Sequence, residues 1–236
     1  GLLLGNAIDY VRRIYKDFEE AGYYCQHFLL DASKMGVPQK RERVFFIGFK
    51  DNNDPFFEYH MNDFIERQKN PAPTIRELLA PLGKAGTKNN PNTCTAKITF
   101  ATRPIMRKSP YAGMYFNGQG RPMCIDGYSN TLPASMGGNK TPFVDEEYLY
   151  GDAPEDWVVA YHKGLMDGSI TPEFTEAPSR LRRITIREAA RIQTFPDNYI
   201  FCGNKGRIYT QIGNAVPCKL AEAVAKAVVT YINEQL

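Results

Sequence analysis

Two arginines separated by a single residue are the side chains of this sequence best suited to chemistry. Arg41 and Arg43 lie in the segment GVPQKRERVFFIGF, residues 36–49. Alternate side chains of an extended strand share a face, so both guanidinium groups should project to one side, with Glu42 turned away. Two planar, permanently charged forks held side by side suit an anion or the acceptor edge of a base. The alternative is an ordinary solvated strand end that carries a surface ion pair.

Two later segments add to this motif. Residues 181–197 read LRRITIREAARIQTFPD, and residues 210–220 read TQIGNAVPCKL. Together with the first segment they resemble, in order and in spacing, the closing motifs of the DNA cytosine-5 methyltransferases. The resemblance implies an α/β fold: the C-terminal part of a Rossmann-like S-adenosylmethionine-dependent methyltransferase domain, with an inserted, loop-rich α+β target recognition domain.

Three parts of that family's pattern are not found in this sequence: the Gly-rich cofactor turn, the cysteine nucleophile of a Pro-Cys-Gln loop, and the glutamate of a Glu-Asn-Val block. The opening residues 1–5, GLLLG, resemble the family's residues directly after Glu-Asn-Val. We therefore expect a C-terminal part that is inactive alone and works with an N-terminal catalytic portion, on the same chain or a separate one. A non-catalytic DNA-binding regulatory protein is a third hypothesis, against which the retained Arg41, Arg43 and Asn214 argue.

The resemblance assigns catalytic roles to the first segment. The family flips a cytosine out of double-stranded DNA and transfers a methyl group to its carbon 5 from S-adenosyl-L-methionine. Arg43 is expected to contact O2 of the flipped base, where negative charge builds during attack on the ring. Arg41 is expected to support the catalytic loop or a nearby phosphate, and Gln39 to order the turn.

The third segment is expected to contribute to the cofactor site. The resemblance assigns Asn214, Ala215 and Val216 to the cofactor pocket, and a helix that starts at Pro217 should offer free N–H groups to the cofactor's carboxylate. Alternatively, Asn214 is only a cap at the start of that helix. Cys218 is expected to be a packing residue, because Lys219 follows it where the family's nucleophile motif has Gln.

Specificity is expected in the inserted domain. Residues 116–122, FNGQGRP, and 127–138, GYSNTLPASMGG, resemble the family's two recognition loops. Gln119 should enter the space that the flipped cytosine leaves, Thr131 should approach the DNA, and Arg121 should read a guanine. The glycines beside Gln119 are expected to let the backbone approach the DNA closely. The alternative for each loop is a plain hairpin turn.

Charge is distributed unevenly along a chain whose net charge is only +3. Residues 78–125 contain seven basic and no acidic side chains, and Lys108 is the one we expect to neutralise a phosphate. Residues 145–156 carry six acidic side chains and no basic one, which we expect to face solvent. The alternative is a merely solvated basic loop region.

The remaining composition argues against other classes of protein. Five cysteines without a Cys-x-x-Cys pair indicate reduced thiols in a cytoplasmic protein and argue against a zinc site. We expect that protein to be prokaryotic. No apolar run has the length of a membrane span, and no signal peptide opens the sequence. We expect double-stranded DNA and the N-terminal catalytic portion as partners, and neither a metal nor a membrane.

The elements that must position these residues follow from periodicity and capping signals. Helices are predicted at 6–21, 74–79, 185–193 and from 217 onward, and strands at 23–30, 43–49, 98–102 and 114–117. The resemblance implies that the arginines at positions 180, 182, 183, 187 and 191 brace the recognition domain against the sheet. Residues 1–49 and 181–236 are predicted to form the catalytic domain, and residues 50–180 the recognition domain.

Overall fold

The computed structural model describes residue 3, residues 5–50 and residues 52–235, so most of the opening pentapeptide lies outside the described residues. After a 3₁₀ turn, η1 (Gly5–Ala7), α1 (Ile8–Glu20) leads into β1 (Tyr23–Asp31). β1 pairs antiparallel with β2 (Glu42–Lys50) through a connection that contains η2 (Ala32–Lys34). The predicted helix and strand pair are confirmed.

One hydrophobic cluster joins this strand pair to the C-terminal helix. α8 (Cys218–Gln235) and α2 (Phe57–Glu66) pack against each other, and their buried side chains form one cluster with those of β1 and β2. Tyr231 of α8 is fully buried and lies 4.8 Å from the ring of Phe49. α8 therefore packs back on the strands as predicted, whereas α2 is an element that the sequence analysis missed.

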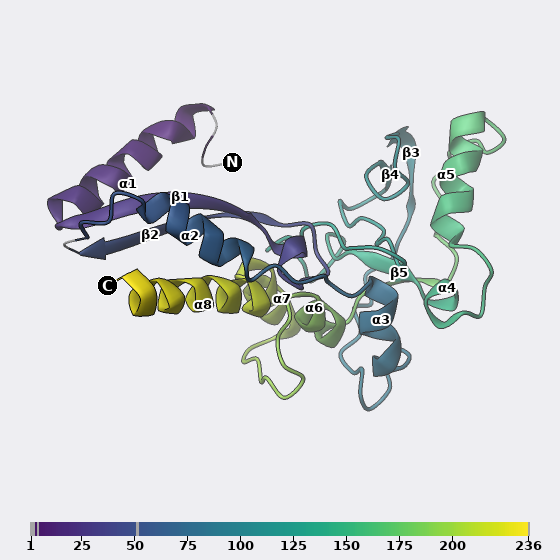
Figure 1. Cartoon of the computed structure of the whole chain (residues 1–236). Coiled ribbons are helices and arrows are strands. Elements are labelled where there is room, and N and C mark those ends of the chain that lie inside the picture. The colour runs from purple at the N-terminus through teal and green to yellow at the C-terminus, as the bar shows by residue number, and fades with distance from the viewer. Residues whose placement is uncertain (1–2, 4, 51, 236) are drawn as a thin grey trace.

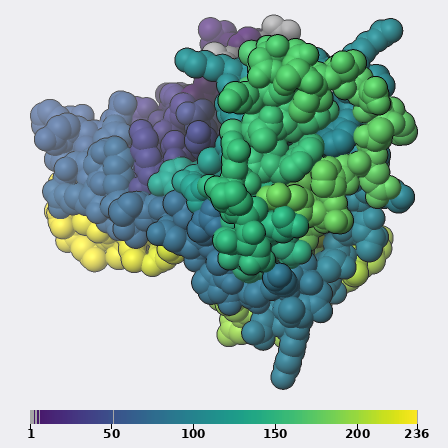
Figure 2. Space-filling view, turned by 90° about the vertical axis from the view of Figure 1, so that its right-hand side faces the viewer, coloured from purple at the N-terminus to yellow at the C-terminus, as the bar shows by residue number. Residues whose placement is uncertain are grey.

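A second lobe lies at the other end of the molecule (Figure 1). It contains the antiparallel pair β3 (Phe100–Ile105) and β4 (Met114–Phe116), and the pair β5 (Phe143–Asp145) and β6 (Leu181–Arg183). α5 (Trp157–Asp167) packs on β3 through aromatic rings, with Tyr161 4.6 Å from Phe100. Figure 2 shows the end of this lobe, which the green segment containing α5 covers.

A third cluster lies between these two parts and below them in Figure 1. It is built from α3 (Ile75–Leu79), η3 (Ala80–Leu82), α4 (Glu146–Tyr150), α6 (Ile186–Ile192) and α7 (Lys205–Asn214). The capping boxes predicted from Thr74 with Glu77 and from Thr185 with Glu188 are both present. Helices α4, α5 and α7 were not predicted.

The acidic segment faces solvent only in part. Glu147, Asp152 and Glu155 are exposed as expected, whereas the expectation is wrong for Asp145 and Asp156, which are buried, and for Glu146, which is half-buried. The carboxylate of Asp145 is fully buried and accepts two hydrogen bonds from Arg180, at 2.9 and 2.7 Å. Arg182 donates to Glu146 at 2.7 Å. Antiparallel pairing of β5 with β6 places these acids beside the arginines, so opposite charges meet within the protein.

The division into a catalytic domain (residues 1–49 and 181–236) and a recognition domain (residues 50–180) stays a prediction. α2, from the segment assigned to recognition, shares a cluster with β1, β2 and α8, whereas α6 and α7 share one with α3 and α4. Across the described ranges, no helix is long and apolar enough to cross a membrane. In the same residues no group of three or more His, Cys, Asp or Glu side chains is placed to hold a metal ion.

Candidate functional site

Arg41 directly precedes β2 and is almost wholly buried, with 3% of its surface exposed. One guanidinium nitrogen, Nη2, donates to the carbonyls of Gly213 at 2.9 Å and Ala215 at 3.2 Å, and Nη1 donates to Leu132 at 3.2 Å. Burial, and to a smaller extent the charge of Arg43, lowers its pKa to about 10. The buried fork of Arg41 thus holds three carbonyl groups, which is a supporting position.

Arg43 has a different environment. It is half-buried, and its guanidinium donates to the carbonyl of Glu42 at 2.7 Å. Burial lowers its pKa, and among the described residues it has no carboxylate partner. The positive charge of Arg43 is therefore not neutralised within this part of the chain. An un-neutralised cation of this kind can stabilise a negatively charged oxygen.

Gln39 is fully buried and joins two distant segments. Its Oε1 accepts the N–H of Leu132 at 2.9 Å, and its Nε2 donates to Oε1 of Gln193 at 2.9 Å. Gln193 is also fully buried and donates to the carbonyl of Ile212 at 2.6 Å. Sequence reasoning missed Gln193. The one signal for it was its position: Gln193 continues, at helical spacing, the apolar stripe of Ile186, Ala189 and Ala190, and an amide buried there needs hydrogen-bond partners.

The predicted cofactor residues follow directly on this network. Asn214 ends α7 and is exposed, Ala215 is half-buried, and Val216 is exposed. The carbonyl of Ala215 accepts from Arg41 at 3.2 Å and from Gln193 at 3.3 Å, which fixes the backbone at this point. An exposed amide beside an apolar side chain fits one side of a cofactor pocket.

The start of α8 does not offer the free N–H groups that we expected there. The N–H of Cys218 donates to the carbonyl of Gln193 at 3.1 Å, and that of Lys219 donates to Oγ1 of Thr194 at 3.0 Å. The end of α6 therefore already caps this helix, and a carboxylate would have to displace those bonds. Burial raises the pKa of the Cys218 thiol, which agrees with a packing role.

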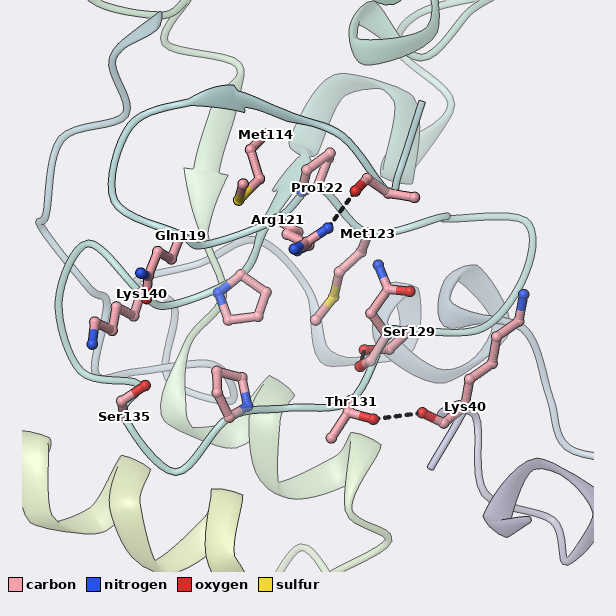
Figure 3. Close-up of a pocket in the computed structure, with 14 residues that line it drawn as sticks. Lys40, Met114, Gln119, Arg121, Pro122, Met123, Ser129, Thr131, Ser135 and Lys140 are labelled. Carbon is pink, nitrogen blue, oxygen red and sulfur yellow. Dashed lines mark hydrogen bonds between the residues drawn. The ribbon is translucent and has the colours of Figure 1, made fainter. Parts of the chain in front are cut away.

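The two predicted recognition loops enclose a hollow of about 550 Å³. Figure 3 shows that Gln119, Arg121 and Thr131 all line it, so the structure brings these three predicted residues together. Its cationic lining side chains are Lys40, Arg121 and Lys140, and no acidic side chain is among the lining residues. We refer to this hollow below as the recognition groove.

The second recognition loop is joined to the start of β2 mainly through backbone atoms. Lys40 donates its N–H to the carbonyl of Ser129 at 2.9 Å, and Ser129 donates to Pro38 at 2.9 Å. Thr131 is exposed, and its hydroxyl donates to the carbonyl of Lys40 at 2.8 Å (Figure 3). The groove and the arginine pair therefore share one rigid junction.

The glycines beside Gln119 are packed closely against other parts of the protein. A Cβ on Gly120 would lie 2.2 Å from the carbonyl oxygen of Thr141, and one on Gly118 would lie 2.5 Å from Cβ of Asn139. Both glycines thus permit close packing within the protein. Gln119 itself has a φ of +62°, unusual for a residue with a side chain, and is exposed.

Lys108 is the predicted DNA contact that the structure does not bring to the groove. It is exposed in the connection between β3 and β4 and is not among the lining residues. Arg121 is half-buried, and its guanidinium donates to the carbonyl of Ala112 (Figure 3). Arg183, by contrast, is buried and donates to the carbonyls of Thr141 at 2.6 Å and Lys97 at 3.1 Å, bracing the loop behind the groove.

Residues 1–230 match the family model of the C-5 cytosine-specific DNA methylases. The chain is 29% identical, over 92% of its length, to type II methyltransferase M.MthTI of Methanothermobacter thermautotrophicus, and 32% identical, over 93%, to M.PspPI of Psychrobacter. It spans 59% and 49% of the length of those two relatives.

Two solved methyltransferases share the fold. The Dnmt2 methyltransferase of S. pombe matches 97% of this chain with a TM-score of 0.57 and 13% identity, and the chain covers 63% of it. The methyltransferase EhMeth of Entamoeba histolytica matches 95% with a TM-score of 0.57 and 14% identity, and the chain covers 59% of it. This similarity confirms the fold class predicted from the sequence.

Proposed function

The chain belongs to the family of C-5 cytosine-specific DNA methylases, and we propose that it is the DNA-recognising, C-terminal part of a cytosine-5 DNA methyltransferase. In this role it binds a specific site in double-stranded DNA and helps to hold the flipped cytosine. The observation that carries the proposal is the recognition groove, because it gathers Gln119, Arg121 and Thr131 within a lining that holds cations and no acid. Such a surface attracts phosphates and leaves polar side chains for base edges.

The two arginines have separate tasks in this proposal. Arg43 contacts O2 of the flipped cytosine and stabilises the negative charge that develops there. Arg41 touches carbonyls of residues 132, 213 and 215 and acts as a positioning residue. Its burial and lowered pKa agree with that supporting role.

S-adenosyl-L-methionine supplies the methyl group when it is bound. Asn214, Ala215 and Val216 would form one side of its pocket, where the exposed Asn214 offers an amide for hydrogen bonds and Val216 presents apolar surface. The other walls, and the cysteine nucleophile, belong in this proposal to an N-terminal catalytic portion. That portion lies on the same chain or on a separate one.

The proposal is tested by selecting DNA duplexes from a randomised pool with the full chain. We expect one enriched sequence motif. Replacing Arg121 with Ala should remove preference at one base pair, a contact worth roughly 1–3 kcal/mol of discrimination. Replacing Lys108 with Ala should weaken binding to all sequences equally and reduce the slope of log affinity against log salt by about one.

Lys163 on α5 is the matched control, since it is an exposed lysine outside the groove. Its replacement by Ala should leave both the motif and the salt slope unchanged. A pool that yields no motif, or Arg121 and Lys108 variants that behave alike on selected and scrambled duplexes, contradicts the proposed reading surface.

A further inference from the structure

Two fully buried glutamines connect the recognition groove to the segment proposed to face the cofactor. Gln39 accepts the N–H of Leu132 at 2.9 Å and donates to Gln193 at 2.9 Å, and Gln193 donates to the carbonyl of Ile212 at 2.6 Å. An unbroken series of hydrogen bonds thus runs from the second recognition loop, through the start of β2 and the end of α6, to the end of α7. It joins residues that are 80 positions apart in the sequence.

Arg41 forms a second bridge, parallel to the first. It donates to the carbonyl of Leu132 at 3.2 Å and to that of Gly213 at 2.9 Å. Both backbone polar groups of Leu132 are therefore held, the N–H by Gln39 and the carbonyl by Arg41. The peptide that follows Thr131 cannot turn without breaking one of these bonds.

The two loops also touch directly. A Cβ placed on Gly213 would lie 2.4 Å from the carbonyl oxygen of Pro133 and 2.8 Å from Cα of Ala134. No side chain fits between them, so a movement of residues 132–134 toward the end of α7 would displace the end of α7 directly. Close packing transmits such displacements, and buried polar groups lose their partners if the two parts separate.

We propose that Gln193, acting with Gln39, is a positioning residue that couples DNA engagement in the recognition groove to the conformation of residues 213–216. This inference rests on the proposed function, in which the groove binds DNA and residues 214–216 face the cofactor. The coupling is reciprocal: what DNA does to the cofactor-facing segment, a bound cofactor does to the recognition loop. Gln193 touches neither ligand, and its effect passes through the carbonyls of Ile212 and Ala215.

The coupling is measured by amide hydrogen exchange on the full chain, with and without a saturating selected duplex. In the wild-type chain we expect the duplex to slow exchange of the N–H groups of residues 213–216 by about fivefold or more, the lower end of typical coupling factors. In Gln193→Met the duplex should still protect the residues lining the groove. Its effect on residues 213–216 should fall below about twofold.

Gln39→Glu is a second, independent break in the same series. It keeps an acceptor for the N–H of Leu132 but removes the donor to Gln193, so it should abolish the coupling even if Gln193→Met does not fold. Gln211→Met is the matched control. Gln211 is an exposed amide of α7 whose side chain donates to Cys202 at 2.8 Å, and its loss should leave the coupling intact.

Four results would overturn the inference. Unchanged exchange at residues 213–216 in a wild-type chain that does bind the duplex refutes the coupling and leaves the proposed function standing. Full protection in both Gln193→Met and Gln39→Glu shows that the glutamines do not carry it. Loss of protection at residues 213–216 in Gln211→Met as well shows that any change in α7 loosens this segment, so the effect is not specific to the two glutamines. A wild-type chain that binds no duplex refutes the proposed function and this inference together.

Discussion

Two arginines separated by one position have opposite environments. Arg41 is surrounded by carbonyl groups and is inaccessible, whereas Arg43 is half-buried with a single backbone partner. The guanidinium of Arg41 thus fixes the local structure, whereas that of Arg43 is available to a ligand. A contact made only as charge develops on the base affects turnover more than binding.

Replacing Arg43 with Ala should therefore reduce turnover by about a hundredfold, the usual loss when one such donor is removed. DNA affinity should change by less than about threefold, because affinity comes largely from phosphates. The measurement is single-turnover methyl transfer, alongside duplex binding, by the chain combined with an N-terminal catalytic portion. Arg13→Ala, on the exposed face of α1, is the control for loss of charge. Equal losses of binding and turnover would make Arg43 a backbone contact.

A second prediction at this scale concerns Asp156, which caps α5 from a buried position. Burial, with a smaller contribution from Asp145, raises its pKa from 3.8 to about 6. When the pKa of a carboxyl group is higher in the folded than in the unfolded state, the group adds to the free energy of unfolding at pH values below its unfolded-state pKa. That contribution is lost as the pH rises through the folded-state pKa. At neutral pH, Asp156 is therefore a charged group held at a cost.

Asp156→Asn keeps the acceptor for the N–H of Val158, which Asp156 holds at 3.0 Å, and removes the charge. Relative to the wild type, the free energy of unfolding of this variant should rise by about 2–3 kcal/mol between pH 4 and pH 7, at roughly 1.4 kcal/mol per pKa unit. Urea unfolding across that range measures it. Asp126→Asn should show no trend within the same window, because Arg76 holds the pKa of Asp126 below its usual value. A flat difference for Asp156→Asn would show that its carboxyl group titrates normally.

At the scale of elements, two capping boxes with the same residue pattern differ in what surrounds them. Glu77 of α3 is exposed, and among the described residues its carboxylate bonds only within its own box, to Thr74. Glu188 of α6 is fully buried. Besides the bonds of its own box, its carboxylate accepts hydrogen bonds from both terminal nitrogens of Arg182, each at 2.8 Å, and from the amide of Asn90 at 2.9 Å. The box on α6 is therefore part of a buried ion network.

Glu188→Ala should destabilise the fold by about 3–5 kcal/mol, because it leaves the guanidinium of Arg182 buried with one of its two carboxylates removed. Glu77→Ala, the same change in the exposed box, should cost much less. Urea unfolding of both variants at pH 7 compares them. Similar losses for the two would mean that the cap alone, and not the ion network, stabilises α6.

At the scale of the whole molecule, the chain is expected to transfer no methyl group by itself. Labelled S-adenosyl-L-methionine and mixed-sequence DNA test this directly. Methyl transfer above background that Cys218→Ser abolishes would contradict both the expected need for an N-terminal portion and the packing role of Cys218. The reading frame upstream of Gly1 separates the remaining hypotheses: a Glu-Asn-Val block there indicates a longer chain, and a start codon indicates a separate subunit.

The sequence predicted those elements whose signals are local. Capping residues marked α3 and α6, and apolar periodicity marked α1 and α8. α2 was missed although Phe57, Met61, Phe64 and Ile65 are buried at helical spacing, because prolines and asparagines surround it. The pairing of residues 145–147 with Arg180 and Arg182 depends on β5 meeting β6, which no local pattern reveals. The role of Gln193 was missed because its partners, Gln39 and the carbonyl of Ile212, come from other segments of the chain.

The second recognition loop takes part in its attachment to the segment before β2 mostly through its own backbone groups. The main chain of Ser129 bonds to Pro38 and Lys40, and that of Leu132 bonds to the side chains of Gln39 and Arg41. Bonds to the main chain of the loop do not depend on which side chains the loop carries. Exposed positions such as Asn130 and Ser135 can therefore change identity while the loop stays in register with the arginine pair. Under the proposed function, exchanging a few side chains of the loop would give the protein a new DNA target without rebuilding the arginine pair.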